Sequence, residues 1–260
     1  MLGFHPKYLV PNAFTALSML FGLASAAASA HGRYDLAAWM ILWGVLLDKL
    51  DGTAARLFKA SSAFGVQYDS FADFVAFGVA PAALCWFRLK DHAAFAGPMQ
   101  WVLIGAAGLY VIAVSGRLAR FNISDPPGGD RYFYGIPTTM MGALLGSFYL
   151  SWESQRWPEA ALLAFPAYLV VGAALMVSGI RLPKLKRRGN LLIDAFQIAN
   201  VGVAYVIAPL RLWPEVLLGQ AAFYLVVGVG FCLVRPPRIQ SEDLDAGGAP
   251  GDHPDLKPAG

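Results

Sequence analysis

Residues 46–78 read LLDKLDGTAARLFKASSAFGVQYDSFADFVAFG, and this stretch places several aspartates in otherwise apolar surroundings. They are Asp48, Asp51, Asp69 and Asp73. An ionised Asp at the centre of a bilayer costs about 2.5–3.5 kcal/mol on insertion scales, so a cluster of them needs a charged partner. We therefore expect this stretch to meet something charged within the membrane.

The spacing places these residues on two helical stripes. Each residue of an α-helix advances about 100°, so positions three, four and seven apart share a face. The first stripe is Asp48, Asp51, Gly52 and Ala55, and the second is Gly65, Asp69 and Asp73. If the two helices face each other, the carboxylates meet in one cavity, and the small residues allow close approach. Oxygen-only ligands suit Mg²⁺, Mn²⁺ or Ca²⁺ rather than zinc, and two ions about 3.5–4 Å apart would suit a phosphoryl displacement.

The same spacing resembles the signature D-x2-D-G-x2-A-R-x8-G-x3-D-x3-D of the CDP-alcohol phosphotransferases. The matching positions are Asp48, Asp51, Gly52, Ala55, Arg56, Gly65, Asp69 and Asp73. A structural alternative is a buried salt-bridge network with Lys49, Arg56 and Lys59. That alternative does not explain the spacing or the two glycines.

The resemblance implies a reaction in which an alcohol attacks the phosphorus of a CDP-linked lipid and releases CMP. It implies two divalent cations, Mg²⁺ or Mn²⁺, as cofactors. By matching position, Asp48 and Asp69 would bridge the two ions and Asp51 would bind one of them. Asp73 would bind the other ion and take the proton of the incoming hydroxyl as the catalytic base.

The resemblance also implies residues that bind the CDP-diacylglycerol. Gly52 would lie against the nucleotide, and Arg56 would contact its phosphates with a planar fork of donors. The segment PNAFT resembles the start of the family's first core helix, although helix capping would equally explain its Asn and Thr. The expected contacts are Asn12, Thr15, Gly52, Arg56, Ser62 and Gly65.

The composition indicates a membrane protein before any motif is considered. The chain has 260 residues, of which 57% are hydrophobic and 14% charged, too much apolar surface for one soluble core. The fold class we expect is all-α, a polytopic transmembrane helical bundle of about eight spans with a six-helix catalytic core. The spans are predicted near 12–30, 35–57, 66–88, 99–121, 137–152, 159–179, 192–210 and 215–234.

The distribution of Lys and Arg supports this topology, because these residues collect on the cytoplasmic side. With eight spans and the N-terminus inside, thirteen basic residues lie in inside segments and five in outside segments. The outside ones are Arg33, Arg88, Lys90, Arg156 and Arg211. This favours a multi-pass cell-membrane protein with both termini and the active site on the cytoplasmic side. We expect residues 1–235 to form the membrane domain and residues 236–260 a disordered cytoplasmic tail.

The acceptor must be inferred from other segments. Residues 115–143, SGRLARFNISDPPGGDRYFYGIPTTMMGA, resemble the R-L-A-R-F-N and G-[LI]-P segments of phosphatidylserine synthases. A serine acceptor needs a cation for its carboxylate, which Arg117 or Arg120 could supply with Asn122 as a polar neighbour. Alternatively, these arginines obey only the positive-inside rule. Thr138 and Thr139 stand where many serine-using relatives carry small residues.

The sequence therefore predicts transfer of a phosphatidyl group from CDP-diacylglycerol to L-serine, giving phosphatidylserine and CMP. Choline, inositol phosphate and glycerol phosphate remain alternative acceptors, and the basic cluster at 181–189 keeps a phosphorylated acceptor open. An alternative of another class is a metal-cation transporter, which predicts acidic residues spread along a path. The expected partners are the two substrates and membrane lipids, with no nucleic acid, and the resemblance implies a possible homodimer.

Overall fold

The computed structural model describes residues 6–60, 62–123, 132–183 and 191–234. The helices before strand β1 are η1 (Pro6–Tyr8), α1 (Leu9–Ala30), α2 (Tyr34–Leu57), α3 (Ala63–Asp73), η2 (Phe74–Val79), α4 (Ala80–Leu89), η3 (Ala93–Phe95) and α5 (Met99–Ile123). Between β1 and β2 lie α6 (Thr138–Ser154), α7 (Glu159–Leu163) and α8 (Phe165–Val177), and after β2 lie α9 (Leu191–Leu210) and α10 (Pro214–Val234). Strands β1 (Tyr132–Tyr134) and β2 (Arg181–Pro183) pair antiparallel, with Phe133 opposite Leu182.

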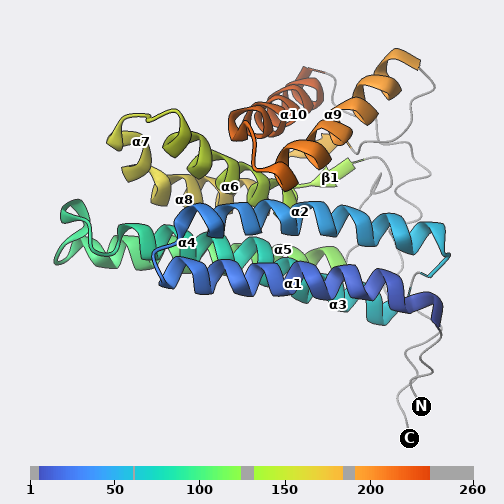
Figure 1. The fold of residues 1–260 in the computed structure, drawn as a ribbon, viewed down its shortest axis with the longest axis horizontal. Helices are drawn as coiled ribbons and strands as arrows, with labels where there is room; N and C mark the ends of the chain where they lie inside the picture. The colour runs from blue at the N-terminus through green and yellow to red at the C-terminus, as the bar shows by residue number, and fades with distance from the viewer. Residues whose placement is uncertain (1–5, 61, 124–131, 184–190, 235–260) are drawn as a thin grey trace, which may run out of the picture.

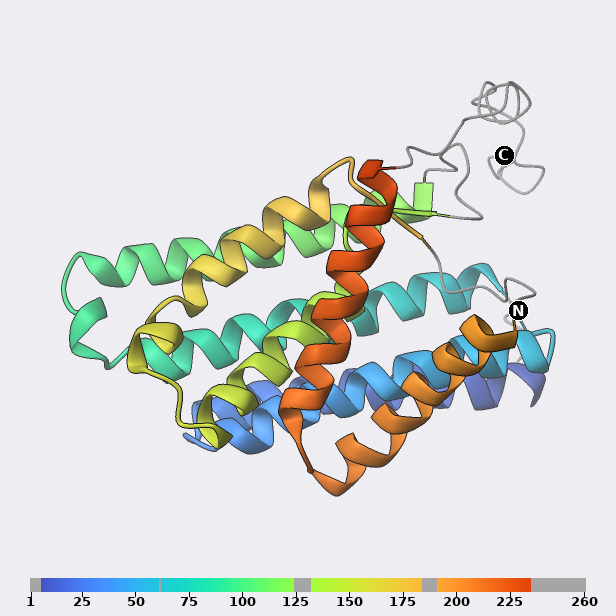
Figure 2. The same cartoon turned by 90° about the horizontal axis from the view of Figure 1, so that it is seen from above.

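The long helices run up and down along one axis of the molecule (Figure 1). Helices α1 to α6 and α8 form this bundle, and α1 packs along α2. Helix α9 is inclined to the bundle, and α10 packs on α6 and runs steeply to the long axis of the bundle (Figure 2). The C-terminal helix pair therefore covers one side of the bundle without extending its parallel array.

Every predicted span coincides with helical structure, and the all-α membrane bundle is confirmed. Among the described residues, three helical segments are long and apolar enough to cross a membrane: Leu9–Ala30, Ala63–Leu89 and Met99–Ile123. Shorter apolar helices occupy Phe165–Val177, Gln197–Leu210 and Pro214–Gly230. Helix α2 has 24 residues, and its C-terminal half carries the charges of the predicted site.

Small residues let α1 pack closely against its neighbours. A Cβ on Gly22 would lie 2.5 Å from the Cα of Ala76 in η2, so only glycine allows this approach. On the same helix, the Ser18 hydroxyl donates to the carbonyl of Gly44 at 3.2 Å and the Ser25 hydroxyl to that of Ala37 at 2.8 Å. These contacts hold α1 against α2, which carries Asp48 and Asp51, and against η2, which directly follows Asp73.

The helical segment Ala63–Leu89 contains Pro81, and a proline leaves one backbone hydrogen bond of the helix unmade. Pro81 has no N–H to donate to the carbonyl of Phe77, four residues earlier. The buried Tyr110 hydroxyl of α5 donates to that carbonyl instead, at 2.8 Å. The six-residue π-helix η2 begins directly after Asp73. The Tyr110 hydrogen bond therefore supports the irregular stretch that follows the second stripe of aspartates.

A tight connection fixes where α6 begins. Gly135 has a φ of +73°, and a Cβ there would collide with the carbonyl oxygen of Met176 at the end of α8. Its N–H donates to Ile180 at 2.8 Å, and the N–H of Ile136 donates to Leu175 at 3.2 Å. The Gly-Ile-Pro segment thereby ties the start of α6 to the end of α8.

Replacing Gly22 by Ala should destabilise the protein, because the added methyl group overlaps the backbone of η2. Overpacking of this kind costs about 1–3 kcal/mol. We expect the Tm of the detergent-purified variant to fall. The matched control is Gly105→Ala in α5, where a Cβ meets nothing within 4 Å. Equal Tm values for the two variants would contradict this packing.

Candidate active site

The aspartates of the two stripes come together where α2 faces α3. One carboxylate oxygen each from Asp48, Asp51 and Asp69 lie within 4.8 Å of one another. The carboxyl of Asp73, one turn after Asp69, contacts that of Asp48. Asp51 and Asp73 are buried, whereas Asp48 and Asp69 are partly buried. The structure thus gathers acidic side chains from the consecutive helices α2 and α3 into one cluster.

Threonine hydroxyls hold two of these carboxylates. Thr15 of α1 donates to Asp51 Oδ2 at 2.8 Å, and Thr138 donates to Asp73 Oδ2 at 2.8 Å. Thr139, the next residue of α6, lies near Asp48. Thr138 and Thr139 are the first residues of α6, where the helix dipole favours negative charge. The N-terminal end of α6 therefore faces the carboxylates.

The sequence predicts no role for these two α6 threonines, which differ there from the small residues of many serine-using relatives. A sequence signal for them does exist. Both threonines follow the Gly-Ile-Pro segment at the start of a helix, where free backbone N–H groups and polar side chains together can bind an anionic group. Their partners lie far away in sequence, so the pairing itself appears only in the structure.

The salt-bridge alternative is wrong for the part of the chain that the structure describes. Within those residues, no Lys or Arg nitrogen lies within 4.0 Å of the clustered carboxylates. Arg56 instead donates to the hydroxyl of Thr53 at 3.2 Å. The ion pairs that do form belong to the opposite end of the bundle. There, Lys90 contacts Asp91 at 3.5 Å and His92 contacts Glu159 at 2.9 Å.

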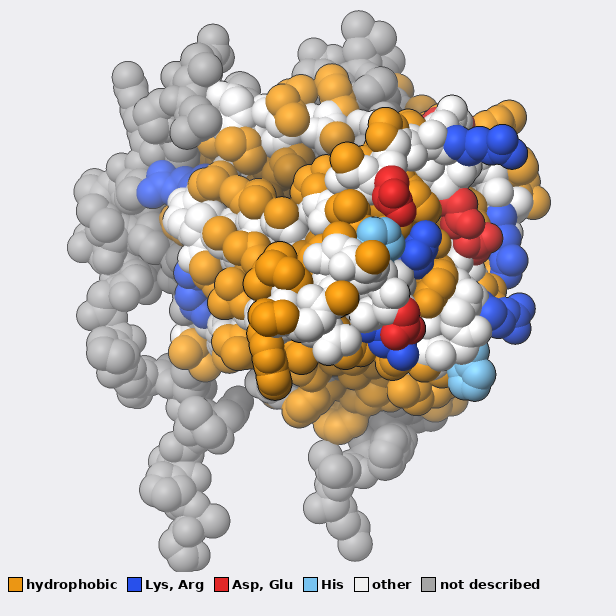
Figure 3. Space-filling model, turned by 90° about the vertical axis from the view of Figure 1, so that its left-hand side faces the viewer, with side chains coloured by type: hydrophobic (Ala, Val, Ile, Leu, Met, Phe, Trp, Pro, Cys, Tyr) orange, Lys and Arg blue, Asp and Glu red, His pale blue; other side chains and the backbone are white. Residues whose placement is uncertain are grey.

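That opposite end, formed by the α4–α5 connection and α7, carries its acidic and basic side chains together (Figure 3). Charges of both signs are interspersed there among apolar side chains, so they compensate one another at the surface. The aspartate cluster forms no ion pair with a Lys or Arg among the described residues. Its excess negative charge favours a bound cation.

The donor set fits a hard divalent cation. All candidate ligand atoms are carboxylate oxygens, which Mg²⁺, Mn²⁺ and Ca²⁺ prefer. Two oxygens bound to one such ion at about 2.0–2.6 Å can lie at most about 4–5.2 Å apart, so the 4.8 Å cluster has a suitable size. The residues that would hold the metal are Asp48, Asp51, Asp69 and Asp73.

Several residues expected to bind nucleotide lie beside this cluster. Ser62 accepts a hydrogen bond from the N–H of Gly65 at 3.0 Å and caps α3. A Cβ on Gly65 would lie 3.8 Å from Oδ1 of Asn12, so these three residues are neighbours. Thr15 is already engaged with Asp51, and its hydroxyl also lies 3.1 Å from the carbonyl of Pro11.

The other two expected nucleotide contacts follow Asp51 on α2. A Cβ on Gly52 would lie 3.6 Å from Nη1 of Arg56, so the missing side chain leaves room beside the guanidinium. Arg56 is exposed. This part of α2 therefore places the positively charged Arg56 guanidinium next to the acidic cluster without an ion pair between them.

Of the expected acceptor residues, the structure brings Arg117 to the cluster. Arg117 is buried, and its Nη1 donates to the hydroxyl of Thr138 at 3.4 Å. Its Nε is also buried and has no hydrogen-bond partner among the described residues. A buried donor without an acceptor is rare in proteins. Arg117 thus has donor capacity left beside the aspartates.

The two other expected acceptor residues make different contacts. Arg120 donates to the carbonyl of Val177 at 3.2 Å and to that of Tyr134 at 3.5 Å. Asn122 donates to the Ser70 hydroxyl at 2.9 Å, so it ties the end of α5 to α3. Neither contact involves one of the clustered aspartates.

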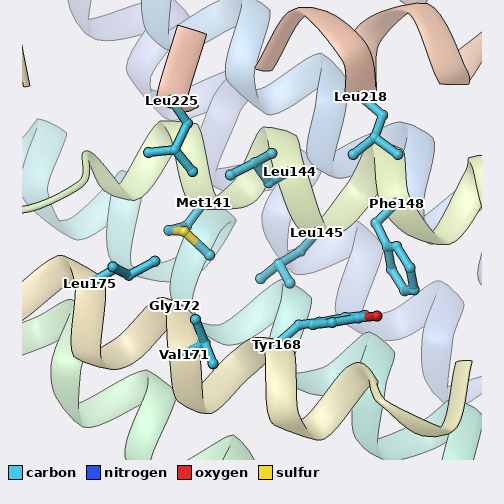
Figure 4. Close-up of a pocket in the computed structure, with 10 residues that line it drawn as sticks. All are labelled: Met141, Leu144, Leu145, Phe148, Tyr168, Val171, Gly172, Leu175, Leu218 and Leu225. Carbon is cyan, nitrogen blue, oxygen red and sulfur yellow. The ribbon is translucent and has the colours of Figure 1, made fainter. Parts of the chain in front are cut away.

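An apolar pocket lies elsewhere, between α6, α8 and α10 (Figure 4). Its volume is about 230 Å³, and Met141, Phe148 and Tyr168 are among the side chains that line it. None of the lining residues belongs to the acidic cluster. Its lining contains no charged side chain, so the chemistry of the site is not located there.

Comparison with known proteins agrees with this geometry. The model of the CDP-alcohol phosphatidyltransferase family matches residues 8–180. The chain is 33% identical over 227 residues to a CDP-diacylglycerol–serine O-phosphatidyltransferase of Helicobacter pylori (strain ATCC 700392 / 26695), covering 86% of this chain and 91% of the relative. It is 32% identical over 190 residues to the enzyme of that name from Mycobacterium tuberculosis (strain ATCC 25618 / H37Rv), covering 68% and 62%. An archaetidylserine synthase of Methanothermobacter thermautotrophicus is 29% identical over 182 residues, covering 69% and 72%. This chain therefore belongs to the CDP-alcohol phosphatidyltransferase family.

Proposed function

We propose that this protein transfers a phosphatidyl group from CDP-diacylglycerol to L-serine, giving phosphatidylserine and CMP. The observation that carries the proposal is the convergence of aspartates from α2 and α3, spaced as the family signature requires. The relatives named for serine transfer support the choice of acceptor. Family membership also favours an enzyme over the transporter alternative.

We propose that the acidic cluster holds two divalent cations, Mg²⁺ or Mn²⁺. When bound, they would supply positive charge that neutralises the donor's phosphates and the departing CMP. Asp48, Asp51, Asp69 and Asp73 would hold these cations as carboxylate ligands. The oxygen-only ligand set and its lack of basic partners among the described residues support this assignment.

Asp73 is the proposed general base. Its carboxylate is buried, and the hydrogen bond from Thr138 fixes its orientation. A carboxylate within hydrogen-bond reach of the incoming hydroxyl can take its proton as the oxygen attacks phosphorus. The bond that forms is between the acceptor oxygen and the phosphorus of the lipid, and the bond that breaks joins that phosphorus to CMP.

The donor nucleotide would lie beside the N-terminal part of α1 and the C-terminal part of α2. Arg56 would contact its phosphates, and Gly52 would allow close approach of the nucleotide. The remaining contacts would come from Asn12, Thr15, Ser62 and Gly65. Their proximity to one another and to the aspartates supports this placement.

For the acceptor, Arg117 is the proposed partner of the serine carboxylate. Its buried guanidinium lies next to Thr138 and keeps an unused Nε donor. Arg120 and Asn122 would support it by holding the end of α5 against β1 and α3. Serine presents a carboxylate and a hydroxyl, which these neighbouring groups could bind at the same time.

We propose that the site opens to the cytoplasm and that both termini lie on that side of a cell membrane. The excess of Lys and Arg in the inside segments supports this orientation. The N-terminal segment 1–5 and the proposed tail 236–260 lie outside the described residues. The division into a domain at 1–235 with a tail, and the homodimer, stay predictions from the sequence.

CMP release by the detergent-purified protein tests the proposed function. CDP-diacylglycerol is supplied with Mg²⁺ or Mn²⁺, and serine, choline, inositol phosphate and glycerol phosphate are offered separately. We expect metal-dependent release with serine alone. Release with a different alcohol would overturn the acceptor, and no metal-dependent release with any of them would overturn the enzyme assignment.

Replacing Asp73 by Asn should remove the base while preserving the shape of the side chain. We expect turnover to fall by about 10²–10⁴-fold, because general base catalysis contributes about that factor. CMP binding, measured by isothermal titration calorimetry with Mn²⁺ present, should persist because the other aspartates remain. The control is Asp35→Asn, an exposed carboxylate near the opposite end of α2. Complete loss of CMP binding in the Asp73 variant would show that Asp73 is chiefly a metal ligand.

A further inference from the structure

Thr138 links the proposed base to the proposed carboxylate-binding arginine. We propose that Thr138 is a positioning residue that holds Asp73 and Arg117 as one unit, so that the hydroxyl and the carboxylate of the acceptor are placed together. The inference rests on the proposed function and adds to it a residue that selects the acceptor. The Thr138 hydroxyl would touch neither the reacting atoms nor the CDP-diacylglycerol.

The direction of the hydrogen bonds follows from the chemistry of the three groups. A guanidinium can only donate, so Arg117 Nη1 donates to the Thr138 oxygen, at 3.4 Å. The single hydroxyl proton of Thr138 is then donated to Asp73 Oδ2, at 2.8 Å. An ionised carboxylate can only accept, so this chain has one consistent direction from Arg117 to Asp73.

All three members of the chain are buried. The exposed fractions are 6% for Arg117, 1% for Thr138 and 8% for Asp73. Away from water, hydrogen bonds to charged groups hold their geometry more strongly than they do at a surface. The bond from Thr138 therefore fixes the orientation of the Asp73 carboxylate, and Arg117 fixes the orientation of the Thr138 hydroxyl.

Arg117 also points to a missing ligand group. Its Nη1 is used by Thr138, while its buried Nε has no acceptor among the described residues. A guanidinium binds a carboxylate through two neighbouring N–H groups, so a carboxylate on the Nε side would satisfy the unused donor. This observation is independent of the family resemblance, since it depends on one atom and its surroundings.

The same arrangement explains why serine would be preferred. In serine, the hydroxyl is attached to Cβ and the carboxylate to the adjacent Cα, so the two groups lie close together. One threonine side chain separates the group that would take the hydroxyl proton from the group that would hold the carboxylate. An amino alcohol without a carboxylate, such as ethanolamine, would leave Arg117 Nε unsatisfied, which strongly disfavours its use.

The start of α6 keeps Thr138 in place. It is the first residue of the helix, directly after the Gly-Ile-Pro segment that is anchored to the end of α8. Only glycine fits at position 135, against the carbonyl of Met176, so the backbone connection sets the position of Thr138. The hydroxyl therefore needs no induced movement to reach both partners.

The test compares Thr138→Val, which keeps the shape but removes the hydroxyl, with Thr138→Ser, which keeps the hydroxyl. We expect kcat with serine to fall about ten- to a hundredfold in the Val variant, as for loss of a hydrogen bond to a charged group. KM for CDP-diacylglycerol should stay unchanged, and the Ser variant should recover most of kcat. The matched control is Ser147→Ala, a buried hydroxyl farther along α6 that bonds only its own helix among the described residues.

A second readout does not depend on turnover. Mn²⁺ binding to each variant is measured as the rise in Tm when Mn²⁺ is added. It should match that of the wild type, because Thr138 positions the base and the arginine and does not bind the metal. Loss of Mn²⁺ binding in the Val variant would overturn the inference and assign Thr138 to the metal site. A Val variant as active as the wild type, or a Ser variant as impaired as the Val variant, would also overturn it.

Failure of this inference can be told apart from failure of the proposed function. The wild-type protein tested with serine and ethanolamine reports on the function, without any substitution. If the wild type and the Thr138→Val variant turn over serine equally, only the role of Thr138 is overturned. A wild type that releases no CMP with serine overturns the function and, with it, the inference.

Discussion

Negative charge crowded into an apolar bundle is the constraint on which the rest of the structure depends. Asp48, Asp51 and Asp69 converge within 4.8 Å, and no basic side chain among the described residues pairs with them. Mutual repulsion would drive these groups apart or protonate them unless cations lie between them. The hydroxyls of Thr15 and Thr138 reduce this cost by donating to carboxylate oxygens, but they add no charge. The site is therefore arranged for divalent cations to complete it.

The helices around the cluster are shaped to keep its members in register. Gly22 lets α1 approach η2 closely, and the Tyr110 hydroxyl satisfies the carbonyl that Pro81 leaves without a partner. Gly135 anchors the connection that brings α6 to the site. Each device lies outside the proposed chemistry, yet each fixes an element that carries a functional side chain. A site assembled from several spans needs such backbone contacts, because no single helix holds the whole set.

Local patterns in the sequence predicted much of this structure. Helical periodicity brought Asp48 and Asp51 to one stripe and Asp69 and Asp73 to another, and hydropathy located helical structure in every predicted range. Contacts between distant segments could not be predicted in the same way. The hydrogen bond from Thr138 to Asp73 joins residues 65 positions apart, and the placement of α10 on α6 depends on side-chain packing. Spacing indicates which residues share a face, whereas packing decides which faces meet.

The central claim is that carboxylates from α2 and α3 bind divalent cation as one unit. Mn²⁺ binding to the purified protein, followed by electron paramagnetic resonance, tests it most directly with Asp51→Asn from α2 and Asp69→Asn from α3. Each substitution should weaken Mn²⁺ binding by at least about tenfold, while Asp35→Asn at the far end of α2 should have no effect. Unchanged Mn²⁺ binding in both site variants would contradict a shared metal site.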